Sequence, residues 1–67
     1  MAAYKIRYYD NEETLLKSET VFMKGLKAAK QSATMTAPDS TVRTVILDIS
    51  ERALLSKELG KWTEHTQ

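Results

Sequence analysis

One short stretch of this sequence occurs twice, and the near repeat constrains the fold more than any other feature of the chain. Residues 10–19 read DNEETLLKSE, and residues 48–58 read DISERALLSKE. Each copy follows an apolar stretch and places a Glu three residues after an Asp, ahead of a Leu pair and a group of Lys, Ser and Glu. Two copies of one local pattern predict the same local structure at both places.

The two segments that precede the copies have the composition of β-strands. Residues 4–9 alternate apolar and basic side chains, which is typical of a strand with one buried side. Residues 41–49 are dense in β-branched side chains and follow Pro38, which ends any helix before it. The side chains expected to face the core are those of Tyr4, Ile6, Tyr8, Val45 and Leu47, and those expected to face outward are Lys5, Arg7, Tyr9, Val42 and Ile46.

Between these strands, residues 22–35 change to the period of an α-helix. Phe22, Leu26, Ala29 and Ala33 follow one another at spacings of four, three and four, which places them on one stripe. We therefore expect an amphipathic helix whose apolar stripe packs on the sheet. The opposite side of this helix carries Lys24, Lys27, Lys30 and Gln31.

The repeated segments fit two structures. As helix starts, both copies resemble capping boxes, with the Asp three residues before the Glu, and the chain order is β-α-β-α. As hairpins, residues 10–13 and 48–52 form turns and residues 15–21 and 54–59 form return strands, which gives the order β-β-α-β-β. Neither turn contains glycine, so the hairpin signal is weak and both readings stay open.

Topology favours the hairpins. Two strands joined by one helix pair in parallel when they are adjacent, and a two-stranded parallel sheet buries little surface, whereas four antiparallel strands under one helix form a complete two-layer core. We therefore expect a single α+β domain over residues 1–67, a two-layer β-β-α-β-β fold with a four-stranded antiparallel sheet and one helix packed on one face. Gly60 and Lys61 either turn the last strand or begin a short extra one, and residues 63–67 are expected to fray.

Composition argues against several functional classes. Ten basic and nine acidic side chains give a net charge of +1, unlike a domain whose whole body binds nucleic acid. The chain has no cysteine, and its longest apolar run, residues 45–47, is far too short to span a membrane, so we expect a cytoplasmic protein without membrane association. A lone histidine, His65, and two glycines offer neither a metal site nor a phosphate loop, so we expect no enzyme activity and no cofactor.

Two surfaces are candidates for binding a partner. The helix lysines form a row of cations suited to phosphates or to an acidic protein surface, although the polar side of an ordinary surface helix looks the same. The outer side of the sheet combines basic and aromatic groups, as sheets that bind nucleic acid or protein partners do. The candidate partner-binding residues are Lys24, Lys27 and Lys30 on the helix and Lys5, Arg7 and Tyr9 on the outer side of the sheet.

Four short motifs add a resemblance to a known group of proteins. These are residues 2–4 (AAY), 26–30 (LKAAK), 54–55 (LL) and 60–62 (GKW). Together they resemble small phage and mobile-element proteins of the anti-CRISPR kind, notably inhibitors of type I-F surveillance complexes, and equally many small bacterial sheet-and-helix domains. The resemblance implies a stoichiometric inhibitor that occupies the guide or target-DNA path of an RNA-guided complex. It adds Lys61, beside Trp62, to Lys27 and Lys30 as candidate contacts.

These observations lead to one preferred function and two alternatives. The preferred function is a non-catalytic protein-binding module, an inhibitor of an RNA-guided nucleic-acid-binding complex if the resemblance holds. The first alternative is a small nucleic-acid-binding domain that uses the lysine-rich helix face and the basic and aromatic outer side of the sheet. The second is a homodimer formed by exposed sheet edges, against a monomer. The expected partner is a protein complex that itself contains nucleic acid, with direct nucleic-acid binding as the competing expectation.

Overall fold

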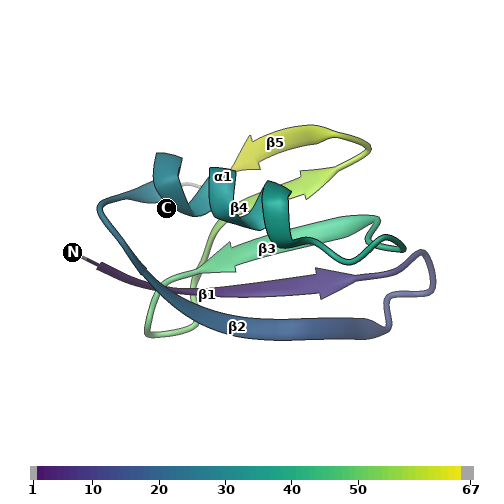
Figure 1. The fold of residues 1–67 in the computed structure, drawn as a ribbon, viewed down its shortest axis with the longest axis horizontal. Helices are drawn as coiled ribbons and strands as arrows, with labels where there is room; N and C mark the ends of the chain where they lie inside the picture. Colours follow the sequence, from purple (N-terminus) through teal and green to yellow (C-terminus); the bar gives the residue numbers. More distant parts are fainter. Residues whose placement is uncertain (1, 66–67) are drawn as a thin grey trace.

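The computed structural model describes residues 2–65 and has one helix against one five-stranded sheet. The elements are β1 (Ala2–Tyr9), β2 (Leu15–Met23), α1 (Leu26–Thr36), β3 (Arg43–Leu47), β4 (Ala53–Glu58) and β5 (Lys61–Glu64). The strands lie in the order β2-β1-β3-β4-β5, and every neighbouring pair is antiparallel. The helix lies across one side of the sheet (Figure 1), and we call the opposite side the open face.

The predicted α+β class, the antiparallel sheet and the two hairpins are confirmed, while the number of strands is wrong by one. The chain order is β-β-α-β-β-β, because residues 61–64 form an extra strand after a turn at Leu59 and Gly60. Both turn residues have left-handed backbone, with φ values of 54° and 76°. This is the geometry of a two-residue hairpin, in which glycine is favoured.

The repeated segments form the same turn twice. In the first copy, Oδ1 of Asp10 accepts hydrogen bonds from the backbone N–H groups of Glu12 and Thr14, each at 2.9 Å. In the second copy, Oδ1 of Asp48 accepts from the N–H groups of Ser50 and Arg52, again at 2.9 Å each. Such a side chain stabilises the turn that follows it. The alternative in which these segments start helices is therefore wrong.

The last residue of each turn is a glutamate at a position where glycine is usual, and for this reason the sequence signal for a hairpin is weak. Glu13 has a φ of 61° and Glu51 a φ of 66°, the left-handed region that glycine usually occupies in turns of this length. An ordinary L-residue there costs roughly 1–2 kcal/mol. The hydrogen bonds of the preceding Asp offset part of that cost, so the turn forms without glycine.

The core lies between the sheet and the helix. Tyr4, Ile6 and Tyr8 of β1 are buried, as expected, and pack with Ala29 and Ala33 of α1. Alanine has no side chain beyond Cβ, so the helix can lie close to the sheet. The predicted buried side of β1 and the predicted small residues of the helix stripe are confirmed.

The predicted sides of the β3 side chains are wrong, because the alternation is shifted by one residue. Ile46 lies opposite Ile6 and is fully buried on the helix side, while Val45 lies opposite Arg7 on the open face. Val45 and Leu47 are nevertheless only 8% and 6% exposed. The strand is the central one of five, so it is buried on both sides and its sequence shows an apolar run instead of an alternation.

The predicted start of the helix is also wrong. The helix begins at Leu26, whereas Phe22 belongs to β2 and is 65% exposed on the open face, opposite Ala3. Lys24 lies in the turn before the helix. The cause is the long pairing of β2 with β1, which holds the chain extended as far as Met23.

The described part of the chain ends more ordered than expected. Thr63 and Glu64 belong to β5, and the backbone N–H of His65 donates to the C=O of Leu54 at 2.9 Å. Residues 66 and 67, also expected to fray, lie outside the described residues. Over residues 2–65, no helix is long and apolar enough to cross a membrane.

Candidate binding groove between the helix and the last strand

The structure divides the predicted binding residues between the two sides of the sheet. Lys27 and Lys30 lie on α1, and Lys24 precedes it. Directly paired residues of neighbouring strands lie on the same side of the sheet, so the strand register shows which residues belong to the open face. By this rule the open face carries Lys5, Arg7, Tyr9 and Lys61, together with Arg43 and Glu58.

The open-face cations at one end of the sheet are neutralised by a single turn carboxylate. A guanidinium nitrogen of Arg7 donates to Oε1 of Glu51 at 2.7 Å, and Nζ of Lys5 lies 3.5 Å from Oε2. The hydrogen bond from Arg7, with the charge of Lys5 added, lowers the pKa of Glu51, and the same bond raises the pKa of Arg7. These two candidate residues therefore bind within their own chain.

The same arrangement occurs at the other end of the open face. A guanidinium nitrogen of Arg43 lies 2.9 Å from Oε1 of Glu13, and the guanidinium carbon lies 4.4 Å from the centre of the Tyr9 ring. The Tyr9 ring that was expected to stack on a base is thus covered by an arginine. The two glutamates occupy equivalent positions of the repeated turns, so the repeat supplies both ends of the face with a carboxylate.

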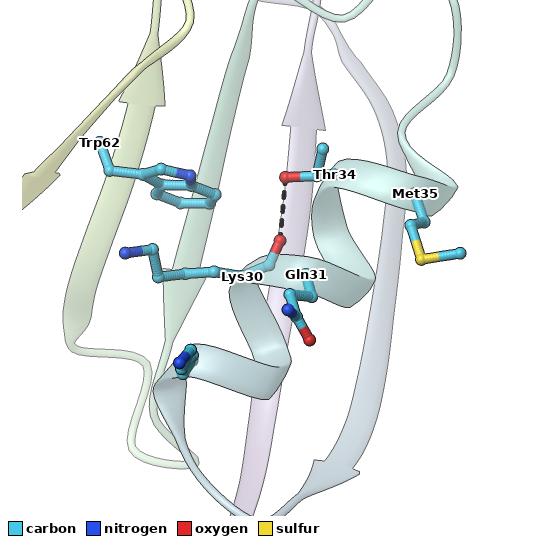
Figure 2. Close-up of a pocket in the computed structure, with 6 residues that line it drawn as sticks. Lys30, Gln31, Thr34, Met35 and Trp62 are labelled. Atoms are coloured by element: carbon cyan, nitrogen blue, oxygen red, sulfur yellow. Dashed lines mark hydrogen bonds between the residues drawn. The ribbon is translucent and has the colours of Figure 1, made fainter.

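On the helix side, a shallow and open groove lies between α1 and β5, and we call it the α1–β5 groove. Its volume is about 540 Å³. Figure 2 shows Lys30 and Trp62 projecting toward each other from the two elements. The hydroxyl of Thr34 is engaged within the helix, donating to the C=O of Lys30 at 3.0 Å. The residues that line the groove are Lys27, Lys30, Gln31, Thr34, Met35 and Trp62.

Two ammonium groups lie near the indole, that of Lys30 in the groove and that of Lys57, which does not line the groove, on the neighbouring strand. Nζ of Lys30 and Nζ of Lys57 each lie 5.7 Å from the centre of the Trp62 ring. This is within the range of a cation–π attraction. Trp62 is half-buried and packs against the core, so it covers the core edge as expected and also presents ring surface to the groove.

The groove lysines differ from Lys5, Arg7 and Arg43 of the open face, which are paired with turn glutamates; Lys61 of the open face has no such pair among residues 2–65. Among residues 2–65, no ion pair involves Lys27, Lys30 or Lys57. The helix itself contains no acidic residue. The groove therefore combines positive charge, an aromatic ring and the Met35 side chain, which suits a ligand with an anionic group beside an apolar or planar one.

One polar pair was not anticipated. Oγ of Ser56, a buried residue of β4, lies 2.7 Å from Nε2 of His65. The bond joins the end of the chain to β4, and the sequence offers no signal for it because it depends on the pairing of β4 with β5. Within residues 2–65, no group of three His, Cys, Asp or Glu side chains is arranged to hold a metal ion.

Comparison with known proteins gives no relative from which a function can be transferred. No protein-family model, curated protein or solved structure matches this chain. The geometry of the α1–β5 groove is therefore the basis on which a function can be inferred.

Proposed function

We propose that this chain is a non-catalytic binding module and that its α1–β5 groove holds an acidic segment of a partner protein. The observation that carries the proposal is the pair Lys27 and Lys30, which have no carboxylate partner among residues 2–65, beside the half-buried ring of Trp62. Tryptophan is a frequent anchor of protein interfaces. Cations near it select acidic partners and accelerate their association.

A second candidate is a nucleic-acid-binding domain, and one observation favours it. An indole flanked by Lys30 and Lys57 can stack one base while the ammonium groups contact phosphates. The open face supports this candidate poorly, since Arg43 covers Tyr9 and Glu51 holds Lys5 and Arg7. A strand bound in the groove also cannot contact the open face without passing around a sheet edge.

The resemblance to inhibitors of type I-F surveillance complexes suggests one class of partner. In that case the groove would bind a protein subunit of the complex, and the target-DNA path would be blocked as a consequence. The direct test is binding of the purified chain to a purified type I-F complex, with and without target DNA. Binding that is lost when target DNA is present supports this partner, and equal binding in both conditions argues against it.

The general test is capture from bacterial lysate, with nuclease treatment and mass spectrometry of the retained proteins. Three forms of the chain are compared: wild type, the Lys27→Glu/Lys30→Glu variant and a matched Lys24→Glu/Lys61→Glu variant. Both variants change the charge equally, but the second leaves the groove lining intact. Circular dichroism shows whether each variant remains folded.

We expect a protein that survives nuclease to be retained by wild type and by the control variant, and lost from the groove variant. Retention by both variants would contradict the assignment of the groove. Loss of all retained material after nuclease treatment would favour the nucleic-acid candidate, and the log of its affinity should then fall linearly with the log of the salt concentration.

A further inference from the structure

The outer edge of β2 is the longest unpaired strand edge in the described chain. This strand has nine residues and lies at one end of the sheet, while the opposite edge strand, β5, has only four. Of the described strand residues, three large apolar side chains are exposed, and all three lie on β2: Leu15, Leu16 and Phe22. A long edge with exposed apolar side chains is a template for pairing with another strand.

The hydrogen-bond ladder identifies the backbone groups that this edge offers. Along an antiparallel strand, successive residues direct their N–H and C=O groups to opposite neighbours. The C=O of Tyr9 accepts from the N–H of Val42 at 2.8 Å, so Tyr9 and every second residue before it face β3. Before the register shift at Tyr9, the partners of these residues on β2 are Ser18, Thr20 and Phe22, which therefore direct their N–H and C=O groups to the free edge.

We propose that two copies of this chain pair antiparallel along β2, about a two-fold axis at Ser18. Charge complementarity selects this register. With Ser18 opposite its own copy, Lys17 of each chain lies opposite Glu19 of the other, on the helix side of the sheet. Within one chain, Nζ of Lys17 already lies 3.3 Å from Oε1 of Glu19, so the dimer brings two such pairs together with alternating sign.

The neighbouring two-fold registers are less favourable. Centring the axis on Glu19 places two carboxylates directly opposite each other, and opposed like charges destabilise a strand pair. Centring it on Thr20 places Lys17 opposite Met23 and Glu19 opposite Val21, which gives neither charge a partner on the second copy. In the Ser18 register the exposed Leu15 and Leu16 of each chain lie along the segment from Thr20 to Phe22 of the second copy.

The dimer is independent of the proposed function and compatible with it. The sheet order places β2 and β5 at opposite edges, so pairing along β2 leaves both α1–β5 grooves open. Two five-stranded sheets join into one continuous sheet with a groove toward each outer end. A partner with two acidic segments would then be bound with higher avidity than either groove alone provides.

The test is the solution mass, measured by sedimentation across a protein concentration series from micromolar to millimolar. We expect a mass that rises to twice that of the chain for wild type and stays at the monomer value for Ser18→Pro. The N–H of Ser18 faces the free edge, so proline there leaves the β1–β2 ladder intact. Circular dichroism checks that the variant is folded. A wild-type chain that stays monomeric up to millimolar concentration would overturn the proposal.

Disulfide cross-linking tests the register without proline, and the chain has no cysteine of its own to interfere. At the two-fold axis the paired Cα atoms lie about 5.5 Å apart, within the range that a disulfide spans. We expect Ser18→Cys to oxidise to a covalent dimer, and Thr20→Cys to do so no faster than Ser50→Cys, a control for random collision in an exposed turn. Faster cross-linking of Thr20→Cys than of Ser18→Cys would overturn the Ser18 register.

Discussion

Positive charge is held differently beside the two repeated turns and at the α1–β5 groove. On the open face, Glu51 pairs with Arg7 and Lys5, and Glu13 pairs with Arg43. On the helix side, Lys30 and Lys57 lie over the Trp62 ring and form no ion pair with any residue from 2 to 65. The comparison teaches that a count of basic residues does not locate a binding site, because a cation without an internal partner is more available to an external anion than one already paired within the chain.

The first prediction compares packing on the two sides and has the largest expected effect. Replacing Ile46 by Ala should reduce the free energy of unfolding by about 2–5 kcal/mol, because this fully buried side chain fills the core under the helix. Replacing Val45 by Ala should reduce it by less, since fewer methyl groups are removed and no helix covers the open face. Urea denaturation at an unchanged m-value measures both. Equal losses would contradict the assignment of the core to the helix side.

The second prediction concerns the polar contact between the helix and the sheet. The Tyr8 hydroxyl donates to Oε2 of Glu19 at 3.0 Å and lies 2.9 Å from Oγ1 of Thr36. Tyr8→Phe should therefore reduce stability by about 1–3 kcal/mol, because Glu19 loses a donor in a partly buried site.

Burial, and then the carboxylate of Glu19, raise the pKa of Tyr8 to about 12 from the ordinary tyrosine value of 10.0. The native state then holds the phenolic proton more tightly than the unfolded state. The stabilisation is complete below pH 10 and is lost as the pH rises through 12. The free energy of unfolding, measured across this pH range, should fall more steeply with rising pH for wild type than for Tyr8→Phe. Parallel pH dependence of the two proteins would contradict the role of the hydroxyl.

The third prediction separates turn strain from ion pairing on the open face. Glu13→Gly should raise stability by up to about 1 kcal/mol, since glycine adopts the left-handed backbone freely and an exposed ion pair contributes little. Glu51→Gly should gain less, because Glu51 pairs with both Arg7 and Lys5. These partners lower the pKa of Glu51, so its contribution is present above pH 4.5 and is lost as the pH falls through the lowered native value.

Thermal unfolding at neutral and acidic pH measures both glycine variants. The difference between them should shrink in acid, when the carboxylate of Glu51 is protonated. A loss of stability in Glu13→Gly would show that the ion pair with Arg43 outweighs the backbone strain. Such a result would mean that the ion pairs of the open face stabilise the native state more than their exposed geometry indicates.

Much of the fold could be predicted from local chemistry. The alternation of β1 assigned its buried side, and topology selected the hairpin reading of the two repeated segments. The facing of β3 could not be read from residues 45–47, since all three are apolar and the central strand buries both sides. Phe22 fits a helical stripe and a strand equally well, and only the length of the β1–β2 pairing decides between them.

The candidate site could be predicted only in part. Lys27 and Lys30 were identified from the helical pattern, but their relation to Trp62 depends on the β4–β5 hairpin, which brings the end of the chain beside the helix. Lys5, Arg7 and Tyr9 were expected to be available to a partner, but this expectation did not take the glutamates of the two turns into account. These carboxylates are distant in sequence from the cations they meet, and the left-handed backbone that directs them is not visible in the residue pattern.

The most direct test of the contrast between the groove and the turns is the quenching of Trp62 fluorescence by charged quenchers. Trp62 is the only tryptophan, so its emission reports on the groove alone. Iodide should quench it more strongly than caesium, because Lys30 and Lys57 attract anions to the indole. Lys30→Glu should remove or reverse the preference, and Lys61→Glu, on the open face, should preserve it. Equal quenching by iodide and caesium in the wild-type chain would contradict the claim that the groove is an unneutralised cationic site.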